Sequence, residues 1–409
     1  MARPSLTALL VAETISVTGN HATRLALPWF VLETTHSAGR MSAVLATQMA
    51  AMAICGIPGG ALAARFSPRR VMQVSDLAQG LLIGLVPALY AADLLSFPVL
   101  LVIVFLVGSF FAPYHAAQRV LLPSLAGDGL RALERANTLL VGAARSAALL
   151  GPAVAAVLIA WVGAAQVLVL DAASFLVASL LVTLAVRTTG PARTTPAKVS
   201  AGVAVLLRDR VLRPWTFGQC ACEMSVQIVL AAIPVMAFLR YGGQAETAGL
   251  LLMLFGAGAV AGNILVLGLL RHFTGTRLIL AGCVLEPLAL WVIVVDTRLI
   301  TLGVMLLLAG VFLGLLNGPG AAMQIERIPP PLRSQGMSAF ATVVLAAGAI
   351  GLAVSGPAAE TLTPSAVFSI VAALYTAGCV LAMIATMRRH APLIEGHESS
   401  LPDHPASHW

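Results

Sequence analysis

Long apolar stretches separated by short polar turns cover most of this chain of 409 residues. Each is long enough to cross a lipid bilayer, which takes about 20 residues in a helix. The twelve stretches that we count cover residues 6–33, 40–63, 70–92, 97–122, 133–161, 164–187, 212–241, 244–271, 275–297, 299–326, 332–358 and 363–388. Because backbone groups in lipid must bond within their own segment, and β-barrel strands would be shorter and alternating, we expect twelve helices.

Residues that restrict the backbone or carry polarity recur 206 positions later. The matching pairs are Pro28 and Pro234, Gly56 and Gly262, Arg65 and Arg271, Gly108 and Gly314, Pro113 and Pro319, Gln118 and Gln324, Pro123 and Pro329, and Gly142 and Gly348. The pattern predicts an all-α integral membrane protein of two pseudo-symmetric six-helix bundles. In membrane proteins, a parallel repeat is typical of transporters with a site between the halves.

The predicted organisation follows from this repeat. Residues 1–187 form the first bundle, residues 188–211 a cytoplasmic linker, residues 212–390 the second bundle and residues 391–409 a disordered tail. Val203, Leu206, Leu207 and Arg210 recur at helical spacing within the linker, which predicts a helix along the membrane surface.

Composition excludes a soluble protein, because 59% of residues are hydrophobic, 10% are charged and mean hydropathy is +0.94. The net charge of +7 is distributed by topology: most of the 24 Lys and Arg residues lie on the side of the termini, and only Arg40, Arg240 and Arg298 lie opposite. The positive-inside rule therefore puts both termini in the cytoplasm, and we expect no nucleic-acid partner. The 23 arginines against one lysine are typical of a bacterial gene of high GC content, which indicates the bacterial inner membrane.

Ionisable residues inside spans are costly and are therefore candidates for function. Glu13, Asn20 and Arg24 share one helical face of the first span, with His21 beside it. The seventh span carries Gln219, Glu223 and Gln227 four residues apart. Shifted by 206, these correspond to positions 13, 17 and 21. We expect the two polar faces to line a central cavity; the alternative is a polar contact between helices without a transport role.

Four acidic residues are candidates for proton coupling. Glu223 is the strongest, because it lies near mid-depth of its span and has no basic neighbour on its own helix. Glu13 is second and lies closer to the cytoplasmic end, where an arginine is a possible partner. Glu286, beside the helix-bending Pro287, and Asp171 in the sixth span have both functional and structural interpretations.

The remaining substrate-cavity candidates are spread over three spans. Arg145 lies at mid-depth of span five and needs a carboxylate partner, with Glu13, Asp171 and Glu223 as options. It either binds an anionic substrate, tunes a proton-accepting carboxylate, or forms a fixed ion pair. The other candidates are Tyr114, His115 and Gln118 in span four and Asn317 in span ten.

One glycine and several charged residues at the inner ends of the spans are candidates for a cytoplasmic gate. They are Gly60, Arg65, Arg69, Arg70 and Asp76 around the turn between spans two and three, Arg119 at the end of span four, and Arg271 in the second half. The alternative is that these arginines only fix topology.

The segment from Gly60 to Arg70, Gly-Ala-Leu-Ala-Ala-Arg-Phe-Ser-Pro-Arg-Arg, resembles the loop signature of the major facilitator superfamily, Gly-x-Leu-Ala-Asp-Arg-x-Gly-Arg-Arg/Lys. Gly151-Pro152 followed by Ala155-Ala156 is similar to the antiporter motif Gly-Pro-x-x-Gly-Gly of drug:proton exchangers. Pro113 to Pro123, Ala136-Asn137 and Ser174-Phe175 fit the branch that includes macrolide efflux and enterobactin export proteins. The resemblance covers about residues 1–390.

This chain departs from the family pattern at several positions. The signature Asp is Ala64, its second Gly is Ser67, and the leading Gly of the antiporter motif is Ala147. The resemblance implies a secondary transporter that exchanges protons for a drug-like molecule, whereas the missing acid weakens the inner charge relay of the family.

The sequence thus predicts a monomeric transporter that exports a lipophilic or amphipathic small molecule by proton antiport and alternating access. Alternatives are an exporter of a siderophore or endogenous metabolite, an uncoupled facilitator or importer, and a membrane sensor or scaffold that transports nothing. The sequence has no phosphate-binding glycine loop, metal-ligand set or nucleophile–base pair, so we expect no enzymatic activity, no metal and no cofactor.

Overall fold

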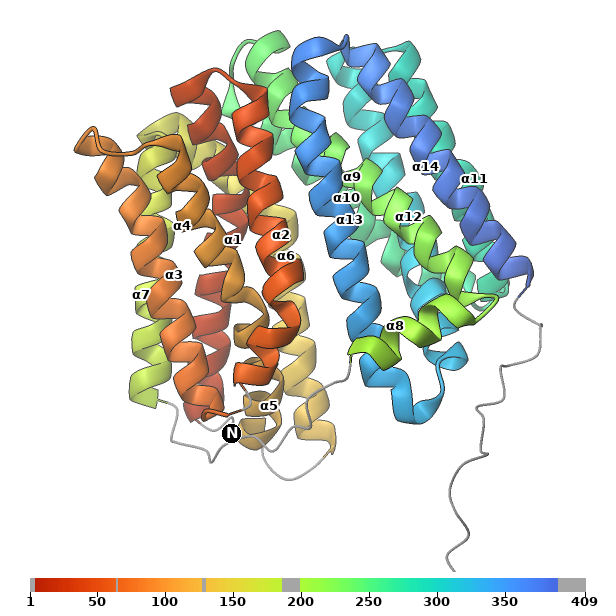
Figure 1. The fold of residues 1–409 in the computed structure, drawn as a ribbon, viewed down its shortest axis with the longest axis horizontal. Coiled ribbons are helices and arrows are strands. Elements are labelled where there is room, and N and C mark those ends of the chain that lie inside the picture. The colour runs from red at the N-terminus through yellow and green to blue at the C-terminus, as the bar shows by residue number, and fades with distance from the viewer. Residues whose placement is uncertain (1–3, 64, 127–129, 186–198, 389–409) are drawn as a thin grey trace, which may run out of the picture.

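The computed structural model describes residues 4–63, 65–126, 130–185 and 199–388, and all regular secondary structure in these residues is helical. The helices form two bundles side by side, one from each half of the chain (Figure 1). The first bundle consists of α1 (Pro4–Thr35), α2 (Ala38–Ala63), α3 (Pro68–Ala91), α4 (Phe97–Ser109), α5 (Phe111–Ala126), α6 (Leu130–Val162) and α7 (Ala164–Ala185). The second consists of α9 (Leu212–Arg240), α10 (Ala245–Leu269), α11 (Gly275–Val295), α12 (Leu299–Arg327), the 3₁₀ helix η1 (Pro330–Leu332), α13 (Arg333–Thr361) and α14 (Pro364–Met387). The predicted fold of two six-helix bundles is confirmed.

Within the described residues, ten helical segments are long and apolar enough to cross a membrane. Helices α1 and α6 are not in this set, although they are the longest in the first bundle. Helix α1 carries Glu13, Asn20, His21 and Arg24 among its apolar residues, and only Leu149–Val162 of α6 forms an apolar run. The polar residues of α1 thus lie on a helix that packs against α6 and α7 of its own bundle.

The fourth span differs from its prediction as one continuous helix. Helix α4 ends at Ser109, and the N–H of Phe110 bonds to the carbonyl of Val107. Pro113 has no N–H to bond the carbonyl of Ser109, which weakens the helix at this point. The chain restarts as α5, which carries Tyr114 and His115.

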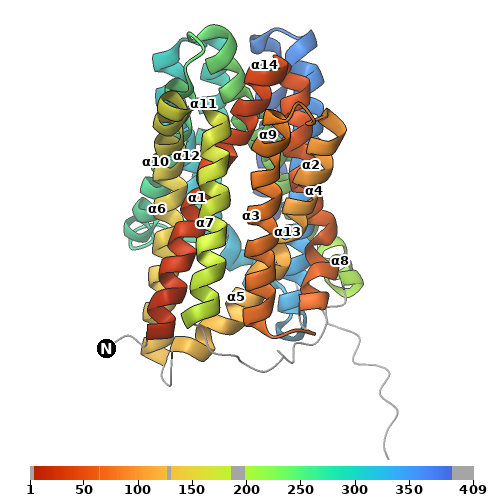
Figure 2. The same cartoon turned by 90° about the vertical axis from the view of Figure 1, so that its left-hand side faces the viewer.

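The sequence repeat is visible in the helix boundaries. Helices α1, α2 and α3 and their counterparts α9, α10 and α11 begin and end within about two residues of the 206-residue offset. Between bundles, α2 packs against α13 and α6 packs against α10. In the repeat, α2 corresponds to α10 and α6 corresponds to α13. The contact between α2 and α13 is therefore equivalent by pseudo-symmetry to the contact between α10 and α6. On the outer face of the first bundle, α7 packs against both α1 and α3 (Figure 2).

Two glycines allow the bundles to approach closely. A Cβ atom at Gly249 in α10 would lie 2.7 Å from the carbonyl oxygen of Pro152 in α6. A Cβ atom at Gly356 in α13 would lie 2.6 Å from the Cα of Gly39 in α2. Any larger residue at these positions would force the backbones apart.

Polar and aromatic contacts join the bundles where α1 passes into α2, at the end away from the N-terminus (Figure 1). The Ser37 hydroxyl donates to Glu360 Oε1 over 2.8 Å, and the Ser355 hydroxyl donates to Ser42 Oγ over 3.1 Å. The rings of Trp29 and Phe238 meet edge to face with centroids 5.7 Å apart. This end of the molecule is therefore closed.

Helix α8 (Val199–Arg208) lies within the predicted linker and packs against α13 of the second bundle. It is followed by Asp209, whose Oδ1 accepts hydrogen bonds from the N–H groups of Val211 and Leu212 at the start of α9. Its Oδ2 forms a buried ion pair with Arg327 Nε at 2.9 Å. These contacts attach α8 to the second bundle. The rest of the predicted linker and the predicted tail lie outside the described residues.

Candidate functional site

A cavity of about 210 Å³ lies inside the first bundle. Helix α1 forms one wall, and α2, α3, α4, α5 and α7 supply the others. Its lining residues are Ser16, Val17, Asn20, His21, Thr23, Arg24, Gln48, Met52, Asp76, Gln79, Val107, Phe111, Tyr114, His115 and Phe175. Ten of these fifteen residues are polar or charged, so polar groups converge on a cavity inside an otherwise apolar bundle.

The structure brings together the cavity residues predicted in the first half of the chain. Asn20, His21, Arg24, Tyr114 and His115 all line the cavity. Gln118 is buried beside them, where its Oε1 accepts a hydrogen bond from His115 Nδ1 over 3.2 Å. The His115 ring also contacts Phe111 edge to face, at 4.4 Å between centroids.

The predicted cavity lined by both α1 and α9 stays a prediction, because the cavity described above has no lining residue from α9. Gln219, Gln227 and Asn317 do not line the cavity, and Asn317 is exposed on α12. The polar face of α9 packs against α13 of its own bundle instead. Gln227 Cγ lies 3.2 Å from the position of a Cβ at Gly348, and the Cys220 thiol lies 3.9 Å from the Val343 carbonyl oxygen.

Two buried carboxyl groups lie at one end of the cavity. Glu13 is 1% exposed and its Oε1 accepts a hydrogen bond from the Tyr114 hydroxyl over 2.5 Å. Asp76 is fully buried, lines the cavity, and has no hydrogen-bond partner on either carboxyl oxygen among the described residues. The two groups are close enough for their charges to interact. Since an ionised pair without a cation is costly in this setting, the arrangement favours holding a proton.

Asp76 corrects the predicted gate. It lies two turns into α3, on the face that packs inside the bundle, rather than with the arginines of the preceding turn. Arg65, Arg70 and Arg271 are exposed. Arg69 donates from Nη2 to the carbonyl of Thr183 over 2.5 Å, which ties α3 to α7 within one bundle.

Arg24 lies at the other end of the cavity and is exposed to it. Beyond it on α1, Leu25, Ala26, Leu27, Trp29, Phe30, Val31 and Leu32 are all buried. This apolar segment closes the cavity toward the joined end of the bundles. His21, one turn earlier, also lines the cavity.

The antiporter-like motif Gly151-Pro152 packs directly behind the cavity. A Cβ atom at Gly151 would lie 2.5 Å from the Cβ of His21, so α6 touches α1 at a cavity residue. The carbonyl of Pro152 faces Gly249 of the second bundle. The motif therefore lies at a junction of α1, α6 and α10.

Asp171 is buried and fully engaged by hydroxyl groups. Its Oδ2 accepts from the Thr23 hydroxyl over 2.5 Å, and its Oδ1 accepts from the Ser174 hydroxyl over 3.1 Å. Thr23 belongs to α1 and Asp171 to α7, so this carboxyl group fixes the two helices against each other.

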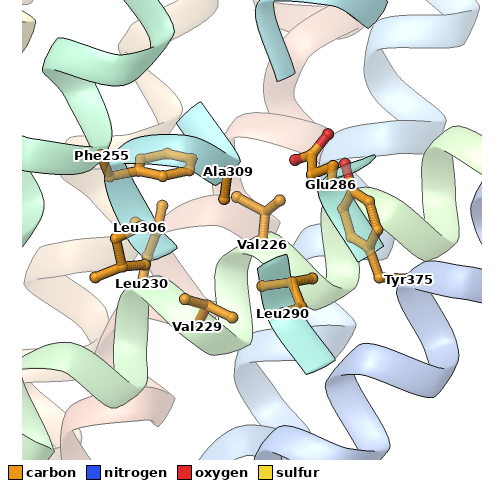
Figure 3. Close-up of a pocket in the computed structure, with 9 residues that line it drawn as sticks. All are labelled: Val226, Val229, Leu230, Phe255, Glu286, Leu290, Leu306, Ala309 and Tyr375. Carbon is orange, nitrogen blue, oxygen red and sulfur yellow. The ribbon is translucent and has the colours of Figure 1, made fainter. Parts of the chain in front are cut away.

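Glu223 and Glu286 lie apart from the cavity. Glu223 is half-buried and accepts a hydrogen bond from Gln227 Nε2 over 2.7 Å on its own helix. Glu286 is 1% exposed and lines a second, apolar pocket of about 10 Å³ beside Tyr375 (Figure 3). That volume holds about one water molecule, so this pocket cannot take an organic substrate.

The side chains of Arg119 and Arg145, and residue Gly60, lie outside what the structure describes in detail, so these predictions are not addressed. Sequence reasoning missed Thr23, Gln48 and Gln79 and misplaced Asp76. One signal was available: Gln73, Asp76 and Gln79 recur at three-residue spacing in an apolar span, which marks an inward polar face.

Comparison with known proteins gives consistent results. The family model of the Major Facilitator Superfamily matches residues 9–285. A multidrug efflux pump, Tap, of Mycobacterium tuberculosis is 27% identical over 378 residues, covering 88% of each chain. Tap of Mycolicibacterium fortuitum is 26% identical over 382 residues, covering 90% of this chain and 92% of the relative.

Among solved structures, the nucleoside transporter NupG aligns with a TM-score of 0.73 at 12% identity, covering 95% of this chain and 99% of that one. A bacterial homologue of the human lysosomal transporter Spinster aligns with a TM-score of 0.70 at 13% identity, covering 95% of each chain. These similarities show the fold.

Proposed function

This chain belongs to the major facilitator superfamily and is a multi-pass membrane transporter, and we propose that it exports a lipophilic or amphipathic small molecule from the bacterial cytoplasm in exchange for protons. The observation that carries this proposal is the buried pair Glu13 and Asp76 at the cavity. Glu13 accepts a hydrogen bond from Tyr114, and neither acid has a cationic partner among the described residues. Similarity to multidrug efflux pumps supports export of drug-like molecules.

The geometry supports alternating access between the two bundles. With both termini in the cytoplasm, the joined end formed by α1, α2, α9 and α13 faces outside. The structure then corresponds to a conformation in which the cavity is closed to the outside. Substrate and proton then compete for the same cavity, because a molecule beside Asp76 changes the surroundings of the acid pair. This competition is what exchange requires.

Glu223 is the strongest acidic candidate from the sequence, but we favour Glu13 and Asp76 over it. Its carboxylate is half-buried, accepts from Gln227 and does not line the cavity. Glu286 is buried in a pocket with room for about one water molecule. We therefore assign proton coupling to the Glu13–Asp76 pair.

Transport in proteoliposomes tests the proposal. With a fluorescent efflux substrate and an imposed pH gradient, Glu13→Gln and Asp76→Asn are expected to abolish gradient-driven movement while leaving substrate exchange without a gradient. Glu223→Gln and Glu286→Gln should retain gradient-driven movement, and the exposed Glu246→Gln is the control for handling and reconstitution. Unchanged gradient-driven transport in both cavity variants would support an uncoupled facilitator instead.

A further inference from the structure

The Arg24 guanidinium is the one cationic group that lines the described cavity besides the histidines. Arg24 is exposed to the cavity, and no ion pair or hydrogen bond to it is present in the described part of the chain. Asp171, an acid on the neighbouring helix α7, is already bonded to Thr23 and Ser174. A guanidinium deep in a membrane protein is costly unless water or a ligand solvates it. Arg24 is therefore accessible to a ligand that occupies the cavity.

The two ends of the cavity carry opposite charge. Arg24 and Glu13 are eleven residues apart on α1, which is about 16 Å along a helix. Asp76 lies near Glu13, at the acidic end. An anionic group is therefore attracted to the Arg24 end and repelled from the acid pair. The charge separation orients a bound molecule along α1.

The surroundings of Arg24 specify what else the ligand carries. Asn20 and Gln48 present neutral amide groups to the same cavity, and Phe111, Phe175 and Met52 supply apolar wall. A guanidinium donates two parallel hydrogen bonds to a carboxylate, sulfonate or phosphate group. The site fits a molecule with one anionic head and an apolar body.

We propose that Arg24 forms an anion-binding subsite at the closed end of the cavity, and that the transported molecules are amphipathic organic anions. The proposal rests on the proposed transport function and names its substrate class. The anionic head binds Arg24 beneath the buried Leu25–Leu32 segment, and the apolar body extends toward Phe111. Arg24 is thereby a residue that determines specificity by charge.

Three naphthalene probes with one ring system and different head groups test this proposal: naphthalene-2-sulfonate, 2-naphthol and 2-naphthylmethylammonium. Their affinities are measured by calorimetry on the full-length protein in lipid nanodiscs. The wild type should bind the sulfonate most tightly. Arg24→Gln should weaken sulfonate binding by about tenfold or more, as expected for a hydrogen-bonded charge, and leave 2-naphthol unchanged. Arg24→Lys keeps the charge without the fork and should be intermediate.

Arg40→Gln is the matched control, because Arg40 is exposed, lies in the first turn of α2 and stacks on Phe97. Melting curves of each variant establish that it is folded. A wild type without preference for the sulfonate, or equal sulfonate affinity in Arg24→Gln, overturns the proposal. A change of equal size for all three probes shows that Arg24 shapes the cavity and does not select charge, which also overturns it. Probe binding in nanodiscs needs no pH gradient. If the wild-type protein binds the probes as expected but shows no proton-driven export in proteoliposomes, the proposed function is contradicted while the Arg24 subsite stands.

Discussion

The Glu360 carboxylate in α13 accepts a hydrogen bond from the backbone N–H of Gly39 in α2, with an N···O distance of 2.9 Å. The same oxygen accepts from the Ser37 hydroxyl. Gly39 lies in the first turn of α2, where N–H groups have no partner within the helix and the helix dipole favours negative charge. An acid of the second bundle thus caps a helix of the first, and this cap forms only when the two bundles meet.

Removing this cap should open the joined end. Glu360→Ala loses two hydrogen bonds of about 1 kcal/mol each, which shifts the balance toward the open state by roughly tenfold or more. Glu360→Gln keeps an acceptor and should have a smaller effect. The measurement is the rate at which a maleimide labels a cysteine placed by Ser42→Cys, a position buried between the bundles. Glu246→Ala, an exposed acid in the first turn of α10, is the control. Equal labelling rates in the Glu360→Ala and parent proteins would contradict the role of the cap.

A side chain at position 356 should keep the bundles apart. In Gly356→Val the added Cβ would meet the Gly39 Cα at 2.6 Å and the Ser42 Cβ at 3.0 Å, so closure requires the backbones to move. We expect a folded protein with fast labelling at position 42 and little transport, because the cycle needs closure at this end. Gly268→Ala, where an added Cβ meets nothing within 4 Å, is the control. Normal transport in Gly356→Val would show that this contact is dispensable.

The sequence was sufficient for the fold because its signals are local and repeated. Apolar run lengths defined the helices, and the offset between pairs such as Pro28 and Pro234 defined the two bundles. The prediction of one continuous fourth span missed the break at Phe110. Pro113 is not a reliable signal of a break, because its counterpart Pro319 lies inside the unbroken helix α12. A proline alone does not decide whether a helix breaks.

Only the part of the site that lies in the first half of the chain was predicted from the sequence. The polar face of α1 does line a cavity, as its residues Asn20 and Arg24 indicated. The similar face of α9 does not, because α13 packs over it near Gly348. Helical periodicity identifies a polar face but not the helix that covers it. Asp76 was grouped with the nearby arginines by sequence distance, whereas helix rotation turns it into the bundle.

Tyr114→Phe should separate proton coupling from substrate binding. The variant keeps the ring and removes the hydroxyl that donates to Glu13 Oε1. A hydrogen bond to a charged group contributes about 1.5–3 kcal/mol, so we expect gradient-driven transport to fall by about tenfold or more. Exchange without a pH gradient should persist in the same proteoliposomes. Tyr90→Phe, on the exposed side of α3, is the control. Equal loss of driven transport and exchange would assign Tyr114 to substrate binding instead.

The buried ion pair between Asp209 and Arg327 should hold α8 to the second bundle. Arg327→Met leaves Asp209 buried without its cation and should reduce stability by about 3–5 kcal/mol. Asp209→Asn combined with Arg327→Met should recover part of this loss, because the amide oxygen can still cap α9 and no buried charge remains. Thermal unfolding in detergent measures both variants. Arg298→Met is the control, since Arg298 pairs with Asp296 at 3.9 Å on the surface and should show no measurable change. If the double variant is no more stable than Arg327→Met alone, the loss comes from the other contacts of Arg327, and the ion pair is not what attaches α8.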